Sequence, residues 1–316
     1  MPAPPPPAFG RPAALPRGAV FLLFEMLSHP STAIRESGNL GLRIHVGQML
    51  GETTEMAKPQ GKCIFCGGHG LTKEHVMPKW IRPLLARFGE TPNHFRFRTG
   101  QAQIPFTNIT SITPNIIPKQ GYFLNQRLRV VCAKCNGGWM SGQESEAKPI
   151  LSALIDANAR PLNESDQLTI ALWACLRAGI FERDHPETAA MKQFEYAHMH
   201  ATKTPPENWR VFLARHDSED WRIRLFHYPF YVFRPGQLRP ANPNSHKTMI
   251  GLGSAVLLVA GSSADNAAKA IEALSPTNMA QVWPFVSSIE WPLTSSLGNE
   301  QLLALSYGSQ IRSYSP

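Results

Sequence analysis

The segment KCIFCGGHGLTKEHVMPKW, residues 62–80, contains two cysteines and, eight residues after the second, the acid–histidine dipeptide Glu74-His75. A carboxylate is a hard oxygen ligand suited to Mg²⁺ or Mn²⁺, and a neutral imidazole can take a proton from water near neutral pH. Hydrolysis of a phosphodiester needs both a cation and a base. Taken alone, such a dipeptide is more often an inert part of a surface, so its meaning depends on its neighbours.

Those neighbours are two C-x-x-C pairs, Cys63/Cys66 and Cys132/Cys135, each followed by a pair of glycines. Two such pairs can supply four thiolates to one tetrahedral zinc, and glycine permits the backbone to fold back toward the sulfurs. Four unrelated buried cysteines would not predict matched spacings, and neither pair has the βαβ context of a redox motif. The sequence therefore predicts one structural zinc, with the fifth cysteine, Cys175, in an apolar helical face of the core.

The basic charge lies in the same part of the chain. The whole sequence has 31 Lys+Arg and 23 Asp+Glu, a net charge of +8. Residues 57–160 hold 14 Lys+Arg and 5 Asp+Glu, which is +9, so the remainder sums to 8 − 9 = −1. A basic surface beside the cysteines favours a nucleic-acid partner. The apolar runs AVFLLFEML and MIGLGSAVLLVAG are too short to cross a bilayer, so we expect no membrane association and a reducing, cytoplasmic location.

Three segments are expected. Residues 1–55 begin with a proline-rich stretch and are predicted to be a disordered, removable extension. Residues 56–160 carry the cysteines, with short strands and loops over 90–120 and a strand over 126–132. A helix should follow, with Ser141 as its N-cap and Glu144 completing a capping box.

Residues 161–316 predict an α+β domain without a recognisable catalytic motif. Helices are expected over 163–184, capped by Ser165 or Asp166, over 186–202 and over 264–274. Strand candidates cover 208–217, 221–233 and 247–261, the last as one buried strand. The remaining histidines, including His198, His200 and His216, lack partners at ligand spacing and are expected at the surface.

The fragments CIFC, TKEHVMPKW and VVCAKCNGGWMSGQE resemble the zinc-knuckle branch of the HNH, or ββα-metal, endonucleases, over about 85 residues from Cys63 to Glu146. The resemblance implies a zinc-braced ββα-metal module followed by the α+β domain. It implies that His75 is the general base and that Glu74 and Asn136 hold a catalytic Mg²⁺ or another divalent cation. The four cysteines would hold a zinc that braces the hairpin against the helix.

The sequence departs from that family in two places. Between His75 and Cys132 lie 56 residues, about twice the usual hairpin. The family's middle asparagine, which supports the histidine loop, falls at Arg127, and Asn125 lies two residues earlier as its substitute. Because Asn136 is a weaker ligand than His or Asp, a further carboxylate is expected to assist. Glu144 is the first candidate and Glu146 the second.

The resulting prediction is a metal-dependent DNA endonuclease. The alternative is a catalytically silent zinc module that binds nucleic acid or a protein. A nuclease acting on RNA would use the same residues, and the sequence leaves the oligomeric state open.

Overall fold

The structure, a computed structural model, describes residues 61–89, 93–96, 100–103, 117–120, 123–233, 238–264 and 278–307. The chain divides into two units, Met1–Glu55 and Met56–Pro316. The extension predicted for residues 1–55 lies outside the described residues, as does nearly all of the helix predicted over 264–274. The described part of the second unit mixes helices and strands, which confirms the α+β class.

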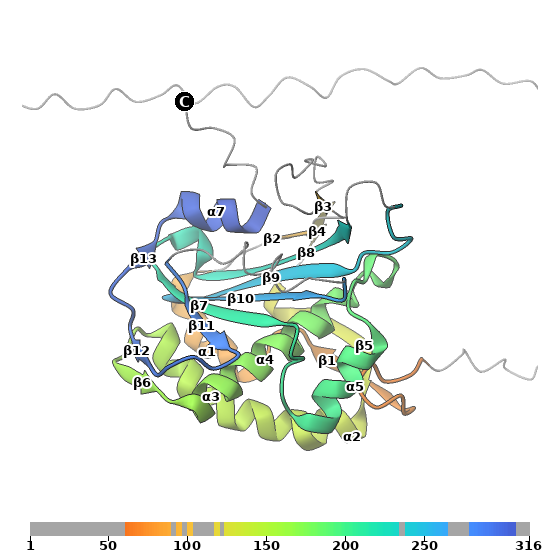
Figure 1. The fold of residues 1–316 in the computed structure, drawn as a ribbon. Coiled ribbons are helices and arrows are strands. Elements are labelled where there is room, and N and C mark those ends of the chain that lie inside the picture. Colours follow the sequence, from red (N-terminus) through yellow and green to blue (C-terminus); the bar gives the residue numbers. More distant parts are fainter. Residues whose placement is uncertain are drawn as a thin grey trace, which may run out of the picture. The chain divides into compact units, whose positions relative to one another are not determined.

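A seven-stranded sheet forms the centre of the second unit (Figure 1). Its strand order is β11-β7-β10-β9-β8-β3, with β13 beside β7. The neighbours are antiparallel except that β3 runs parallel to β8 and β13 parallel to β7. The strands are β3 (Gly100–Gln103), β7 (Arg210–His216), β8 (Ile223–Phe233), β9 (Ser245–Leu252), β10 (Ala255–Ser262), β11 (Ala280–Trp283) and β13 (Ser296–Leu297).

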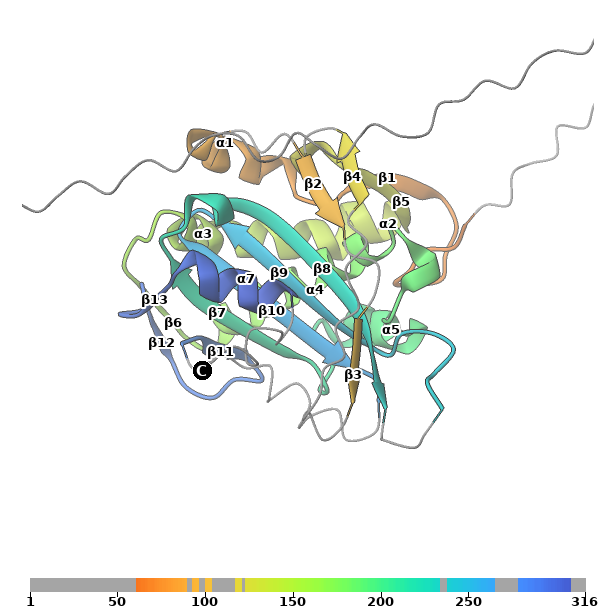
Figure 2. The same ribbon diagram turned by 90° about the horizontal axis from the view of Figure 1, so that it is seen from above.

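Helices cover both faces of this sheet. Helices α3 (Ser141–Ile155) and α4 (Glu164–Glu182) lie on one face and α7 (Asn299–Tyr307) on the other (Figures 1 and 2). Every residue of β9 and β10 is therefore buried, which accounts for the nearly continuous apolar sequence of β10 and of the second half of β9. One hydrophobic cluster extends from Cys63 to Trp291. Residues on both sides of the boundary predicted at 160 thus share one core.

The run 247–261, predicted as one strand, forms two strands joined by a tight turn at Gly253 and Ser254. Gly253 has φ +58°, a conformation that glycine adopts readily. Its N–H donates to the Arg222 carbonyl, and the Ser254 N–H donates to the Ile155 carbonyl at the end of α3. The prediction of one strand was wrong because both strands are buried, so apolar residues continue up to both sides of the short Gly253-Ser254 turn.

The cysteine-bearing segment forms a hairpin and a helical run. Strand β1 (Leu71–His75) pairs antiparallel with β5 (Arg127–Cys132), which confirms the strand predicted over 126–132. Between them, β2 (Asn93–Arg96) pairs with β4 (Ile117–Gln120). The shorter helical elements are η1 (Lys79–Ile81), α1 (Arg82–Leu85), η2 (Ala86–Phe88) and η3 (Phe123–Asn125).

The predicted capping box at Ser141 is wrong. The helical run begins earlier, with α2 (Ala133–Cys135) and the π-helical turn Asn136–Met140, and kinks at Gly138. Helix α3 therefore starts inside a continuing helix, and no side chain caps it. Helix α4 is capped by Asn163, whose side-chain oxygen accepts from the Asp166 N–H, and not by the predicted Ser165 or Asp166.

The helix predicted over 186–202 is shorter than expected. Helix α5 spans Gln193–Thr202, and only a 3₁₀ turn, Pro186–Thr188, precedes it. Strand β6 (Arg160–Leu162) pairs with β12 (Ile289–Trp291), so the chain at residue 160 is tied to its C-terminal part. No helix among the described residues is both long and apolar enough to cross a bilayer.

The turn at Gly253 gives the first testable prediction. A Cβ at Gly253 would lie 2.4 Å from the Ile155 carbonyl oxygen, and the positive φ disfavours any other residue. We expect Gly253→Ala to lower the free energy of unfolding by about 2–4 kcal/mol in denaturant titration. The control is Gly142→Ala in α3, where a Cβ meets nothing within 4 Å; it should raise stability by about 0.5–1 kcal/mol. Equal stability of the two variants would contradict this docking of α3 on the turn.

Candidate metal centre and acid–histidine site

The first cysteine pair lies in a tight loop that directs its sulfurs inward. The Cys63 N–H donates to the Gly68 carbonyl, and the Gly67 N–H donates to the Cys63 carbonyl. The Gly68 N–H donates to the Cys66 sulfur over 3.4 Å. Gly67 has φ +71°, which explains why glycine follows this pair.

The second pair is placed by β5 and α2, since Cys132 ends the strand and Cys135 lies one turn into the helix. The Ala133 N–H donates to the Gly70 carbonyl, so the loop and the strand end are joined by the backbone as well. The second glycine pair, residues 137 and 138, accommodates the kink in the helical run.

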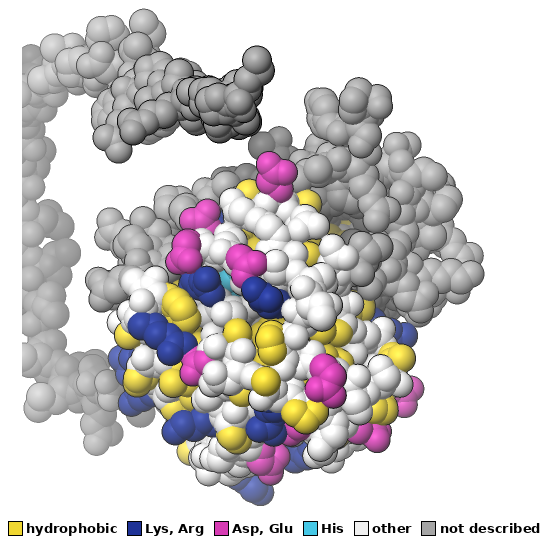
Figure 3. Space-filling model, turned by 90° about the vertical axis from the view of Figure 1, so that its left-hand side faces the viewer, with side chains coloured by type: hydrophobic (Ala, Val, Ile, Leu, Met, Phe, Trp, Pro, Cys, Tyr) yellow, Lys and Arg dark blue, Asp and Glu magenta, His cyan; other side chains and the backbone are white. Residues whose placement is uncertain are grey.

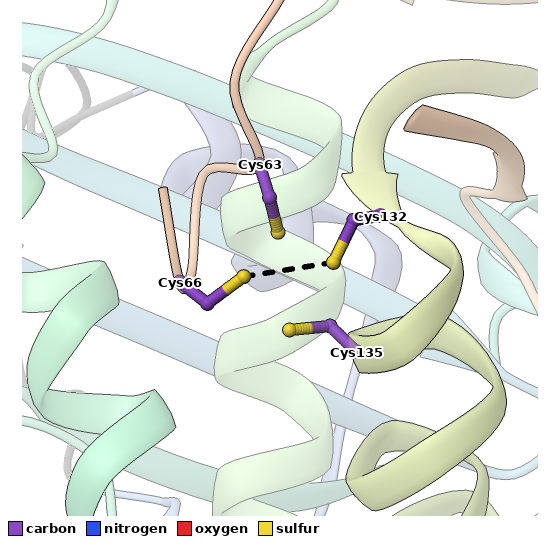
Figure 4. Close-up of side chains that lie close together, drawn as sticks. All are labelled: Cys63, Cys66, Cys132 and Cys135. Atoms are coloured by element: carbon purple, nitrogen blue, oxygen red, sulfur yellow. Dashed lines mark hydrogen bonds between the residues drawn. The ribbon is translucent and has the colours of Figure 1, made fainter. Parts of the chain in front are cut away.

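All four sulfurs point toward one centre (Figure 4) and lie within 4.8 Å of one another, which confirms the predicted convergence. The sulfurs of Cys66 and Cys132 are 3.5 Å apart. A tetrahedral metal with bonds of about 2.3 Å would separate its sulfurs by about 3.8 Å, so the spacing suits a four-thiolate site. In the described part of the chain, these four cysteines are the only group of three or more His, Cys, Asp or Glu side chains that lie close enough together to hold one ion.

The thiols of Cys63, Cys66 and Cys135 differ in the direction of their pKa shifts. Burial raises the pKa of Cys63 and of Cys135. Burial also acts on Cys66, but the Gly68 N–H and the neighbouring cysteines outweigh it and lower the pKa of Cys66 to about 7. Cys66 is also the exposed member of the set. Because burial disfavours the thiolates of Cys63 and Cys135, metal binding to these cysteines should release protons.

The cysteine loop also packs on the C-terminal half of the chain. The Phe65 ring makes edge contacts with Trp139 at 5.4 Å and with Tyr196 of α5 at 5.8 Å. The Gln193 side chain donates to the Ile64 carbonyl over 2.7 Å. Trp139 therefore packs against the cysteine loop.

Glu74 is buried on the inner side of the hairpin, at the end of β1. One of its oxygens accepts a hydrogen bond from Arg177 Nη1 over 3.1 Å. The second guanidinium nitrogen, Nη2, lies 3.4 Å from a carboxylate oxygen of Glu144. Burial raises the pKa of Glu144, as does the charge of Glu74, while Arg177 opposes that rise. Glu74 and Glu144 are thus brought together around a guanidinium.

His75 follows Glu74 on β1, where Arg127 is its cross-strand partner. It is half-buried. Burial and nearby positive charges lower the pKa of His75 from its ordinary 6.5; the charges belong, in decreasing order of effect, to Arg82, Lys79, Arg127 and Arg177. The imidazole is therefore neutral at neutral pH, with cationic side chains near it.

The remaining predicted residues lie as follows. The Asn136 side-chain amide donates to the Thr72 hydroxyl over 3.0 Å, which ties the start of the helical run to β1. Asn125 is exposed at the end of η3, and Glu146 is exposed on α3. Among the described residues, no hydrogen bond joins Asn136 to Glu74 or His75. Convergence of these three on one cation remains a prediction.

Arg177 is the residue that the sequence reasoning missed. Its side chain is fully buried on α4, about 100 residues from the hairpin that it contacts. One signal was available, because Arg177 is the single charged residue between Asp166 and Glu182 in an otherwise apolar helix. Such a residue requires a buried partner of opposite charge.

Three further histidines contradict the prediction that they lie at the surface. His216, His227 and His246 are all buried in or beside the central sheet. His227 lies 3.6 Å from the carboxylate of Glu182, which also accepts two backbone N–H groups. The prediction was wrong because both faces of these strands are covered, so a histidine on either face is buried.

Comparison with protein-family models, with curated proteins and with solved structures gives no match for this chain. The likeness to the HNH endonucleases therefore stays a resemblance of short motifs. Figure 3 shows the side of the molecule on the left in Figure 1, where Lys and Arg are interspersed with Asp and Glu rather than gathered into one basic patch.

The cysteine centre gives the second prediction. Zinc added to metal-free protein should bind at about one ion per chain, measured by elemental analysis after desalting. Cys63→Ser should abolish tight binding and lower the melting temperature, because it removes one of four ligands. The control is Cys175→Ala, which changes a buried cysteine of α4 outside the cluster and should retain the zinc. Equal zinc content in both variants would contradict the four-cysteine site.

Proposed function

We propose that this protein is a metal-dependent endonuclease of the HNH type, with a structural zinc held by the four cysteines. The observation that carries the proposal is the position of His75. A neutral imidazole at the end of β1 lies near Arg82, Lys79 and Arg127, directly after a buried carboxylate. Phosphodiester hydrolysis needs a base beside cationic groups that attract the phosphate.

In this proposal the chain's own residues divide the work. His75 accepts the proton of the attacking water. Arg82, Lys79 and Arg127 bind the phosphates that flank the scissile bond. Glu74, Asn136 and Glu144 would hold a divalent cation, which when bound neutralises charge on the phosphate and on the departing 3′ oxygen. The zinc would fix β1, and with it His75, relative to the helical run.

The charge around Arg177 is compatible with a cation. Two carboxylates and one guanidinium sum to −2 + 1 = −1, and Glu144 keeps its side chain 23% exposed. Arg177 contacts one oxygen of Glu74, and a carboxylate has lone pairs for further partners. A cation that reached this cluster from the side of Glu144 would meet unbalanced negative charge.

The same contacts favour a second candidate function, a catalytically silent zinc module that binds nucleic acid or a protein. If Arg177 fully satisfies Glu74 and Glu144, it takes the place that the catalytic cation would need.

DNA is the proposed substrate because of the basic charge of residues 57–160, and RNA would be bound through the same residues.

A plasmid-nicking assay tests the proposed function. Wild-type protein should relax supercoiled DNA with Mg²⁺ or Mn²⁺ and not with EDTA. His75→Ala should lower the rate by about 10²–10⁴-fold, because it removes the general base. The control is His69→Ala, an exposed histidine of the cysteine loop, which should cleave as wild type does.

Zinc content and DNA binding of His75→Ala should match the wild type, since neither the cysteines nor the basic side chains change. Equal cleavage by His75→Ala would contradict the role of His75. Absence of cleavage by the wild type with any divalent cation, together with retained DNA binding, would support the silent module instead.

The pH dependence gives a further prediction. A base whose pKa is lowered stays neutral to a lower pH than an ordinary histidine, so kcat/KM should fall at a lower pH than it would for a histidine of ordinary pKa. The acid limb of the profile should have its midpoint below 6.5, measured at constant ionic strength and with zinc content checked at each pH. A midpoint above 6.5 would show that His75 is not the titrating base.

A further inference from the structure

Arg177 makes four contacts, two of them to the acid–histidine dipeptide. Nη1 donates to the Glu74 carboxylate over 3.1 Å, to the His75 carbonyl over 3.0 Å and to the Val76 carbonyl over 3.5 Å. Nη2 lies 3.4 Å from the Glu144 carboxylate. One side chain of α4 therefore connects the end of β1 to α3.

These contacts fix both groups of the dipeptide at once. Glu74 is fixed through its side chain, while His75 is fixed through its carbonyl and through the carbonyl that follows it. The backbone at His75 determines where the imidazole projects, because adjacent strand residues point to opposite faces. A guanidinium suits this task, since it presents donors in a rigid plane and stays charged when buried, whereas a lysine ammonium is a flexible point donor.

The burial of Arg177 is costly unless its contacts are retained. Its side chain is fully buried, and a charged group leaves water only when partners compensate for its lost hydration. In the described part of the chain its ion-pair partners are Glu74 and Glu144. The orientation of the Glu74 carboxylate is thus coupled to the position of α4.

We infer that Arg177 is a positioning residue that sets the geometry of the Glu74–His75 segment from α4. Its catalytic consequence rests on the proposed nuclease function. Arg177 does not touch the reacting phosphate in this account. It holds the carboxylate in one orientation and the His75 backbone in one place, so that base and cation ligand keep a fixed relation.

Arg177→Lys tests the inference, because it keeps the positive charge and removes the planar donor set. Amide hydrogen exchange followed by mass spectrometry should show faster exchange in peptides covering residues 71–81, with the peptides of β9 and β10 unchanged. In the nicking assay kcat should fall by about 10²-fold with KM for plasmid within about twofold, because a small misplacement of a base affects the chemical step and not binding.

The matched control is Arg183→Lys at the end of the same helix. Arg183 donates to the Tyr196 hydroxyl and lies outside the dipeptide's contacts, so its replacement should leave exchange over 71–81 and nicking unchanged. If Arg177→Lys does not fold, Glu144→Gln replaces it, because it weakens the partner of Nη2 while Arg177 remains. That variant should show a smaller increase in exchange confined to the same peptides.

The readouts separate this inference from the proposed function. Unchanged exchange over residues 71–81 in the folded variant overturns the inference, whatever the nicking assay gives. Faster exchange with an unchanged kcat shows that the contacts are structural only, which also overturns it. Absence of nicking by wild-type protein rejects the nuclease proposal, and the exchange measurement then decides by itself whether Arg177 positions the segment.

Discussion

The convergence of two cysteine pairs on one point is the constraint on which the rest of the site depends. Cys66 and Cys132 are 66 residues apart in sequence, and their sulfurs are 3.5 Å apart in space. Holding them together pairs β1 with β5 and places the start of the helical run beside Thr72. The 56 residues between His75 and Cys132 can then vary in length, because loop-closure entropy rises only slowly with length. The cysteine centre thus explains how a long connection between the two cysteine pairs is compatible with a compact site.

A second constraint comes from charge. Arg177 brings the carboxylates of Glu74 and Glu144 together, yet it competes for them with any cation that they would bind. A buried ion pair is weak evidence for stability, because desolvation offsets much of the attraction. The cluster keeps one net negative charge, and the choice between an active nuclease and a silent zinc module depends on whether that charge admits a cation.

The features of the fold and of the site that depend on local chemistry could be predicted from the sequence. Ligand spacing predicted the four-cysteine cluster, and alternation predicted β5. The hairpin of β9 and β10 was missed because strands buried on both faces show no alternation, so the short Gly253-Ser254 pair had to mark the turn by itself. Arg177 was missed because its partners lie about 100 residues away, and local patterns carry no information about such pairs. The helical start at Ala133 was hidden by two glycines that usually end a helix.

The most direct test of the central claim is anomalous diffraction from crystals grown with zinc and soaked in Mn²⁺. The account predicts a zinc peak bonded to the four cysteine sulfurs. It also predicts a separate manganese peak within bonding distance of Glu74 and Asn136, with His75 within reach of a water on that ion. A zinc peak at the cysteines, with Arg177 in place and no manganese beside Glu74, would contradict the nuclease account.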